Sequence, residues 1–243
     1  MELRRFALVA AAGLVLVCAS AASAADNTDP LEGLNRATFA FNDFFDRWFL
    51  KPVAIGYRKV TPDVAELGVS NFFANLGEVR NAANNLLQFK PAAAAGDVGR
   101  LTINSTIGIA GLFDVASRLG LERHDEDFGQ TLGRWGVGAG PYLVLPFLGP
   151  SSLRDGPSLV PDAFAGPVLY LHEDAVRLGL AGLSAIEARA GLLDAEAILD
   201  EVGGDRYTAI RDAYLQRREF LVSDGEPSVN DLFEDFDDEE EDF

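Results

Sequence analysis

Apolar residues recur with helical spacing along most of this chain, and the first strong pattern runs from Leu31 to Leu50. Leu34, Phe41 and Phe45 fall on one helical face. A buried core helix explains this pattern, and so does a helix lying in a membrane interface, which aromatic residues favour. The aromatic side chains of the segment cover more than half of its circumference: Phe39, Phe41, Phe44, Phe45, Trp48 and Phe49.

Further helices are predicted downstream by the same spacing and by proline and glycine at their ends. Pro52 is expected to end the first helix. The approximate ranges of the later helices are 62–74, 76–89, 92–107, 161–180, 182–193, 195–202 and 205–222. The pattern therefore predicts a mainly α protein built from amphipathic helices.

The stretch from Asp127 to Asp155 departs from this pattern because it is rich in glycine and proline and almost uncharged. Between Phe128 and Leu153 its only charged residue is Arg134. Such a loop must be buried in protein, folded as a tight hairpin, or placed against lipid, because its backbone needs partners and its side chains gain nothing from water. Tyr142 to Leu145 is expected to be extended, within a hairpin-like loop.

The composition is unusual because the chain is both hydrophobic and strongly acidic. Apolar residues make up 48% of the 243 residues and the mean hydropathy is +0.08, yet the formal net charge is −18. Such acidity argues against binding to a nucleic-acid phosphate backbone, which needs clustered lysine and arginine. One cysteine and two histidines leave no basis for a disulfide framework or a zinc site, and no metal or cofactor is predicted.

The two ends of the chain are predicted to differ from its body. Residues 1–24 show the basic, apolar and small-residue regions of a secretory signal peptide, with cleavage after Ala24. In the alternative interpretation cleavage precedes Cys18, which then carries lipid. No later segment has the ~18 to 20 uninterrupted apolar residues of a spanning helix. Residues 25–222 are expected to form the helical domain, and 223–243 an acidic disordered tail.

Candidate catalytic chemistry is weak. His124 stands beside Asp125, Glu126 and Asp127, a pattern that a general base can use but that is more typical of a solvated turn. Ser151-Ser152 lack a nucleophile elbow, and the glycines of 136–140 lead into a strand where a phosphate loop would lead into a helix. We predict no enzyme and no catalytic residues. The arginines of the last helix are expected to form a solvated face paired with Asp212 and Glu219; they are Arg206, Arg211, Arg217 and Arg218.

Several blocks of the chain resemble the MlaA (VacJ) family of outer-membrane lipoproteins. The resemblance runs in order from about Asp29 to Val222. It is carried by DPLEGLNR at 29–36, SNFFANL at 70–76, FGQTLG at 128–133, GAGPY at 138–142 with LRD at 153–155, and DAYLQRR at 212–218.

This resemblance implies a single ring-like helical domain set in the inner leaflet of a Gram-negative outer membrane, on its periplasmic face. It implies transport without bond breaking: phospholipid misplaced in the outer leaflet is removed and passed to a soluble periplasmic lipid carrier, beside a trimeric porin. The chain departs from the family at its anchor, because the residues before Cys18 fit a lipidation site poorly.

Two groups of residues become candidate sites in this picture. The aromatic residues of 31–50 are expected to be embedded in lipid or core. The Gly/Pro-rich loop is expected to line or gate the lipid channel, with core packing as the simpler alternative; its residues are Gly136, Gly138, Gly140, Pro141, Tyr142, Leu143, Pro146 and Gly149. Two other functions stay open, a structural porin-associated envelope protein without lipid conduction and a lipid hydrolase.

Overall fold

The protein is mainly α-helical, as the periodicity predicts, and the computed structural model describes residues 29–225. The expected signal peptide with Cys18, and residues 226–243 of the expected tail, lie outside the described part. The elements in chain order are α2 (Glu32–Phe45), η2 (Asp46–Leu50), α3 (Lys51–Val60), α4 (Asp63–Leu87), α5 (Pro91–Thr106), α6 (Val115–Arg118), α7 (Phe128–Arg134), β1 (Tyr142–Leu145), β2 (Gly149–Ser152), α8 (Asp155–Ala165), η3 (Pro167–Tyr170), α9 (Asp174–Gly191), α10 (Leu193–Val202) and α11 (Arg206–Val222).

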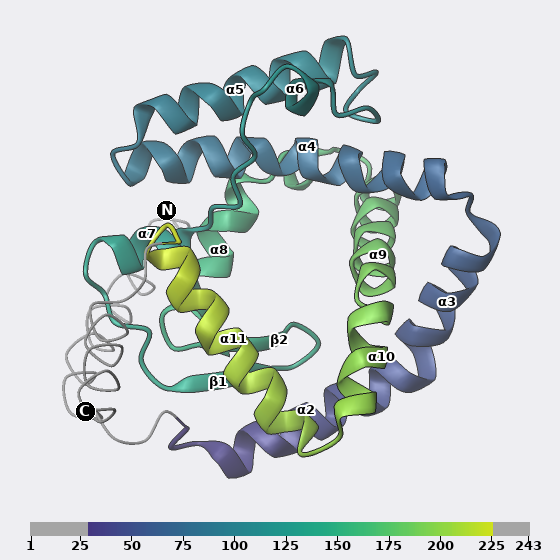
Figure 1. Cartoon of the computed structure of the whole chain (residues 1–243), viewed down its shortest axis with the longest axis vertical. Helices are drawn as coiled ribbons and strands as arrows, with labels where there is room; N and C mark the ends of the chain where they lie inside the picture. The colour runs from purple at the N-terminus through teal and green to yellow at the C-terminus, as the bar shows by residue number, and fades with distance from the viewer. Residues whose placement is uncertain (1–28, 226–243) are drawn as a thin grey trace, which may run out of the picture.

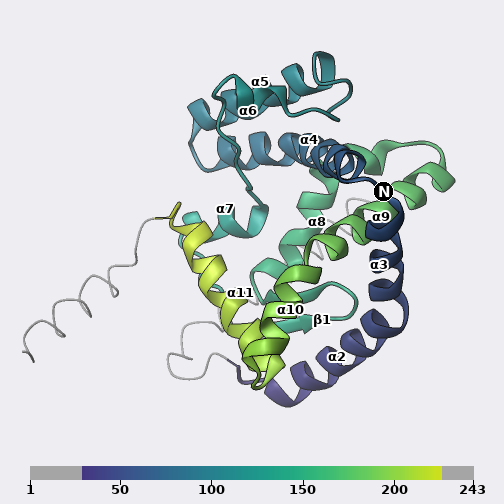
Figure 2. The same cartoon turned by 45° about the vertical axis from the view of Figure 1, so that its right-hand side comes forward.

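The helices form a frame around a centre, which agrees with the single ring-like helical domain that the resemblance implies (Figure 1). α4, α3 and α2 are three successive sides, and α7 and α11 lie along the remaining side. α5 packs beside α4 on the outside of the frame, whereas α9 packs against α3 on the inside. The view in Figure 2 again places the α4–α5 pair and α2 at opposite ends.

The first long helix does not end at Pro52, contrary to the prediction, because a π-helical turn carries the backbone past it. A proline lacks an N–H, and its ring clashes with the carbonyl four residues earlier, here that of Trp48. In the wider π turn η2 the Lys51 N–H binds the Asp46 carbonyl, which replaces the regular α-helical bonding at this point. α2, η2 and α3 therefore form one continuous, curved rod (Figure 2).

α4 is one uninterrupted helix of 25 residues, where the sequence predicted two helices over 62–74 and 76–89. The predicted break lay at Asn75, a residue with low helix propensity. Asn75 is buried, and its side-chain amide donates to Ser105 Oγ on α5 at 2.9 Å. The contact with the neighbouring helix thus overrides a weak local preference.

The helix predicted over 161–180 is broken into α8, η3 and α9. The break falls at Gly166-Pro167, because a proline restricts the preceding residue to extended backbone, and Gly166 has φ −74° and ψ 124°. α9 then continues through the boundary predicted near 181. α10 and α11 lie within two residues of their predicted ranges, and Gly203, with φ 73°, ends α10.

The Gly/Pro-rich stretch contains a β hairpin, and the strand predicted at 142–145 is present. β1 and β2 pair antiparallel, with Tyr142 opposite Ser152. Three residues join the strands, and Phe147 in the middle has φ 64°, followed by Gly149 with φ 84°. Left-handed residues of this kind produce tight hairpin turns. The stretch also contains the short helix α7, which the sequence did not predict.

The apolar core is small and lies where the hairpin meets α2 and α11. Its buried members are Tyr142, Val144 and Tyr207, with Phe39, Tyr214 and Leu215 packed against them. Within residues 29–225, no helix is both long and apolar enough to cross a bilayer.

Candidate functional site

Polar and apolar side chains are distributed in the reverse of the usual order. Among residues 29–225, twenty polar or charged side chains are buried, against eight apolar ones, of which five are alanines. In the same part of the chain thirty-five large apolar side chains are exposed. Proteins folded in water bury most of their large aliphatic and aromatic residues. This surface is therefore suited to contact with an apolar phase.

α4 supplies much of the polar interior, on the face that it turns toward α5 and the connection before α7. Glu78 accepts a hydrogen bond from Arg100 Nε at 2.7 Å, and both side chains are almost fully buried. Burial raises the pKa of Glu78, although Arg100 opposes this effect. The buried polar residues of α4 recur at helical spacing along one face and its margin, and the C-cap Gln88 continues the series: Asn75, Glu78, Asn81, Asn84 and Asn85.

Asn35 of α2 binds the backbone of β1 through both atoms of its amide. Its Nδ2 donates to the Tyr142 carbonyl at 2.9 Å, and its Oδ1 accepts from the Val144 N–H at 2.9 Å. The same Nδ2 donates to Asp29 at 2.7 Å. The side chain is 1% exposed, so each of these bonds satisfies a group that has no access to water.

Asn42 repeats this contact at the turn of the hairpin. Its Nδ2 donates to the Leu145 carbonyl at 2.9 Å, and its Oδ1 accepts from the Phe147 N–H at 2.8 Å. The seven positions from Asn35 to Asn42 span about 10.5 Å of α-helix. Three residues of β strand cover about 10 Å. The two amides therefore match the strand in register and hold the hairpin along α2.

An aromatic surface covers α2, η2 and the turn of the hairpin. Phe147 packs edge-on against Phe41 and Phe45, with ring centroids 5.2 and 5.1 Å apart. Of the six aromatic residues assigned from the sequence to a membrane-embedded helix, Phe39 packs into the core against Tyr207, with centroids 5.6 Å apart. The other five are exposed: Phe41, Phe44, Phe45, Trp48 and Phe49. Their contact with lipid stays a prediction.

The residues assigned to the channel or gating loop have different surroundings. Gly136, Gly140 and Gly149 have φ values of 87°, 68° and 84°, which favour glycine, whereas Gly138 does not have a positive φ. Tyr142 is fully buried in the core. The remaining members flank β1 or belong to it: Pro141, Leu143 and Pro146.

The exposed part of the hairpin is its turn. Phe147 and Leu148 are 64% and 69% exposed, and sequence reasoning did not single them out. The available signal was a pair of large apolar residues between Pro146 and Gly149, where a solvated turn would carry polar ones. The role of the loop as a gate stays a prediction.

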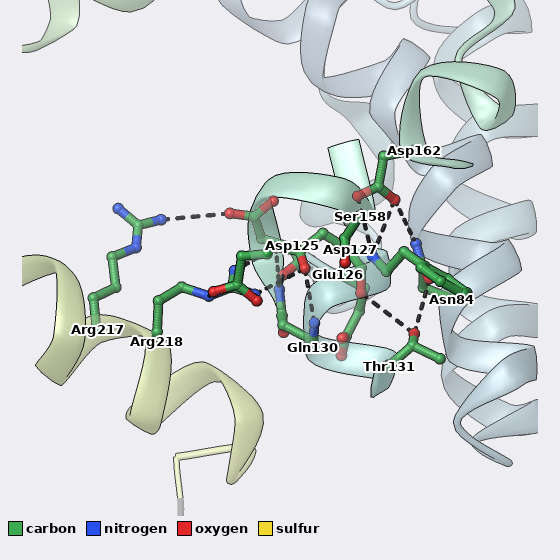
Figure 3. Close-up of polar contacts among 12 residues, drawn as sticks. Asn84, Asp125, Glu126, Asp127, Gln130, Thr131, Ser158, Asp162, Arg217 and Arg218 are labelled. Carbon is green, nitrogen blue, oxygen red and sulfur yellow. Dashed lines mark hydrogen bonds and ion pairs between the residues drawn. The ribbon is translucent and has the colours of Figure 1, made fainter. Parts of the chain in front are cut away.

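The cluster at 124–127 is not the solvated turn that the sequence favoured. Glu126 is 6% exposed and accepts hydrogen bonds from Gln88 Nε2 at 2.7 Å and Lys90 Nζ at 3.2 Å. Figure 3 shows this connection packed against α4. The cluster is therefore a polar joint between α4 and α7 that is buried at Glu126 and exposed at Asp125, which four consecutive polar residues did not reveal.

Asp127 links this joint to the last helix. Its side chain caps α7 by accepting the Gln130 N–H at 2.8 Å and also accepts two hydrogen bonds from Arg218 (Figure 3). Burial acts to raise the pKa of Asp127, but the Arg218 guanidinium and the Gln130 N–H lower it to about 2. Asp127 is accordingly a carboxylate at neutral pH.

The arginines of α11 do not form a solvated face paired along their own helix, as predicted. Arg211 pairs along the helix, with Nε 2.8 Å from Asp212, but its Nη1 also lies 3.7 Å from Asp29. Arg206 binds Glu196 of α10 at 2.7 Å, and the other two reach acids in the joint before α7. α11 therefore fastens distant parts of the frame to one another.

A second ionic cluster lies at the corner where α2–η2–α3 meets α9, α10 and α11. Glu196 is paired with Arg206 at 2.7 Å, with Lys51 at 3.2 Å and with Arg189. Arg189 also pairs with Asp46 of the π turn at 2.7 Å. Burial acts to raise the pKa of Glu196, but hydrogen bonds from the three cations lower it to about 2.

Clefts open between these elements in the described part of the chain. One of about 500 Å³ lies between α11 and the Gly-rich loop, and one of about 370 Å³ lies where the end of α11 faces residues 122–126. A third, of about 280 Å³, lies between α4, η3 and α9. Its walls combine Phe73, Leu76, Val168 and Leu180 with the polar side chains of Arg80, Asp162 and Ser184.

His124 has a structural explanation. Its Nδ1 lies 2.6 Å from Asp97 Oδ1, and the other oxygen of Asp97 accepts from Asn85 at 2.8 Å, so the imidazole ties the joint to α5. Within residues 29–225 no group of three or more His, Cys, Asp or Glu residues could hold a metal ion.

Comparison with known proteins gives consistent matches. The family model of the MlaA lipoprotein matches residues 27–221. The intermembrane phospholipid transport system lipoprotein MlaA of Escherichia coli (strain K12) is 38% identical over 231 residues, which cover 93% of this chain and 91% of that protein. The Haemophilus influenzae protein of the same name is 33% identical over 204 residues, which cover 82% and 81%.

A solved structure also matches. Its description reads "Structural basis for maintenance of bacterial outer membrane lipid asymmetry". It aligns with this chain at a TM-score of 0.71 and 37% sequence identity. The match covers 81% of this chain and 100% of the other.

Proposed function

Because this chain belongs to the MlaA lipoprotein family, we propose that it is a non-enzymatic component of an intermembrane phospholipid transport system. It removes misplaced phospholipid from the outer leaflet of the outer membrane and passes it to a soluble periplasmic carrier, which maintains lipid asymmetry. The observation that carries this proposal, beside the family, is the apolar surface around a polar interior.

The polarity of the frame suits a phospholipid. Acyl chains need apolar surroundings, and a headgroup needs charged or hydrogen-bonding partners, so both must lie within reach along one path. The cleft between α4, η3 and α9 combines the two, since apolar walls meet Arg80, Asp162 and Ser184 there. Helices satisfy their own backbone groups, so a helical frame can contact lipid without leaving backbone polar groups unpaired.

The aromatic surface of α2 and η2 supplies attachment to the inner leaflet. Burying a large apolar side chain contributes about 1.5 to 3 kcal/mol. Five half-exposed aromatic residues together then contribute roughly 5 kcal/mol, comparable to one acyl chain. The aromatic residues therefore supply attachment of the same order as one acyl chain, whether Cys18 is lipidated or cleavage follows Ala24. We place the protein on the periplasmic face of the outer membrane, beside a trimeric porin.

The hairpin is the proposed gate of the lipid path. It is held to α2 by two asparagine amides and by the packing of Phe147 on Phe41, and its exposed turn carries no charge. A disulfide between cysteines at positions 41 and 147 locks the turn to α2. Lipid transfer should stop in the oxidised protein and return on reduction, so the same protein is its own control. Full transfer in the oxidised state removes the gate from the proposal.

Two experiments test the function itself. The full chain, purified in mild detergent from outer membranes, should carry phospholipid that mass spectrometry detects above the level found on a porin from the same preparation. Deletion of the gene should raise the amount of phospholipid exposed on the cell surface, and expression of the full chain should reverse it. Normal surface phospholipid in the deletion strain contradicts the proposal and favours a purely structural role.

A further inference from the structure

A single guanidinium closes the base of the segment that carries the Gly-rich loop and the hairpin. The segment begins at Asp127, the cap of α7, and ends at Asp155, the first residue of α8. Arg218 of α11 donates to both oxygens of Asp127, through Nη1 to Oδ2 and through Nη2 to Oδ1, the latter at 3.0 Å. The same Nη2 donates to Asp155 Oδ1 at 3.1 Å. Its Nε lies 3.0 Å from the second Asp155 oxygen. Figure 3 shows Arg218 reaching from α11 to Asp127.

From Asp155 the contacts continue into the loop. Asp155 accepts from Arg154 Nε at 2.8 Å and from the Tyr214 hydroxyl at 2.7 Å. Arg154 donates through Nη1 to the Val137 carbonyl at 3.3 Å and through its backbone N–H to the Ala139 carbonyl at 3.1 Å. A continuous chain of polar contacts thus leads from Arg218 to the backbone of the Gly-rich loop.

Two glycines of α7 make room for this contact. A Cβ on Gly129 would lie 2.4 Å from Asp155 Oδ1 and 2.7 Å from Arg218 Nη2. A Cβ on Gly133 would lie 2.8 Å from Val222 Cγ1. The glycines are one helical turn apart, as are Arg218 and Val222, so the bare face of α7 fits one face of α11. The close approach therefore depends on residue types from both helices.

The adjacent arginine lacks these features. The Arg217 side chain is 70% exposed and makes one long contact, 3.4 Å, to Asp125, whereas the Arg218 side chain is 12% exposed. Arg218, Arg154, Asp127 and Asp155 carry two positive and two negative charges at neutral pH. Removing Arg218 leaves Asp127 without its cationic partner and leaves Asp155 with Arg154 as its one remaining cation, which disfavours the closed arrangement.

We propose that Arg218 is a positioning residue for lipid transport, which holds both ends of the 127–155 segment on α11 and so fixes the place of the hairpin. The inference rests on the proposed function, in which the hairpin is the moving part. A bidentate arginine suits this task because its planar fork reaches two carboxylates at once, which a lysine ammonium does not do.

Hydrogen exchange of the full chain in detergent tests the contact directly. In Arg218→Met the amides of residues 136–154 should exchange roughly tenfold faster or more, because the base of the segment is released. Arg218→Lys should give an intermediate rate, and Arg217→Met should match the wild type. Exchange in α4 and α9 should stay unchanged. Asp155→Asn provides a second route to the same release if Arg218→Met fails to fold.

A second readout separates this inference from the proposed function. In a deletion strain, Arg218→Met at normal membrane abundance should fail to lower surface phospholipid, whereas Arg217→Met should restore it. The positioning role is overturned if exchange at 136–154 is unchanged in Arg218→Met, or if exchange in α4 and α9 rises equally. It is also overturned if exchange at 136–154 becomes faster while lipid transport stays normal. If the deletion itself does not raise surface phospholipid, the proposed function fails, while the exchange result still decides whether Arg218 holds the segment.

Discussion

Neutralising Glu196 should weaken the corner of the frame where five helical elements meet. Glu196 is 8% exposed and pairs with Lys51, Arg189 and Arg206, and Arg189 in turn holds Asp46 of the π turn. Glu196→Gln keeps the shape and one acceptor oxygen but removes the charge. The three cations then lose their shared partner, while the rest of the corner stays in place.

The size of the effect follows from the pKa of Glu196. Folding lowers it from 4.5 to about 2 because the three cations outweigh the effect of burial. At about 1.4 kcal/mol per unit, the ionised side chain contributes roughly 3 kcal/mol to the free energy of unfolding. A pKa lowered by folding gives stability that is complete above pH 4.5 and is lost as the pH falls toward 2.

Thermal unfolding of the detergent-solubilised protein between pH 3 and 7 measures this contribution. In a chain of this length roughly 3 kcal/mol corresponds to a midpoint about 6 to 12 °C lower in Glu196→Gln at pH 7. The difference between variant and wild type should shrink as the pH falls below about 4.5. Glu201→Gln, on the same helix but exposed, is the matched control and should behave as the wild type. A difference that stays constant with pH, or an equal loss in Glu201→Gln, refutes this reasoning.

Three further changes address the hairpin, the α7–α11 contact and the membrane surface. Asn42→Ala removes two hydrogen bonds, so the Phe147 amide should exchange about 30-fold faster than in the wild type. Asn42→Asp keeps only the acceptor, so its exchange rate should lie between the two. Equal exchange rates in all three proteins contradict the role of the Asn42 amide. Gly133→Ala should lower the free energy of unfolding by about 1 to 3 kcal/mol, measured by thermal unfolding. Gly138→Ala, whose Cβ meets nothing within 4 Å, should leave it unchanged. A larger loss in Gly138→Ala than in Gly133→Ala excludes the steric argument. Trp48→Glu should move the protein from the membrane fraction to the soluble fraction, whereas the Trp48→Leu protein should remain in the membrane fraction. A Trp48→Glu protein that still fractionates with the outer membrane counts against embedding of η2.

The aromatic face of 31–50 was predictable because it depends only on local helical spacing. The function of the polar residues within this face was not recognised, since Asn35 and Asn42 look like interruptions of an apolar pattern until the strand that they bind is known. The end assigned to Pro52 was wrong because the rule for proline assumes regular α-helical bonding, which the π turn avoids.

The buried polar stripe of α4 had a signal in the sequence that went unused. Four asparagines lie from Asn75 to Asn85, an unusual density for a helix interior, but periodicity of apolar residues indicates the buried face only where apolar side chains point inward. The role of Arg218 had no local signal at all. Its partners lie 91 and 63 positions away, so only the fold brings them together.

The reversed polarity of the frame also determines which substitutions the chain can accept as it diverges. A hydrogen bond depends on angle and on donor or acceptor type, so a buried asparagine such as Asn35 has no equivalent replacement. An apolar side chain facing a fluid hydrocarbon phase needs only to remain apolar, because nothing rigid has to match its shape. Substitutions of one hydrophobic residue by another are therefore expected to be tolerated on the outside of the frame. Substitutions should be tolerated least at its polar centre. Sequence drift in this fold should thus appear as leucine, valine, isoleucine and phenylalanine replacing one another around a nearly fixed set of amides and ion pairs.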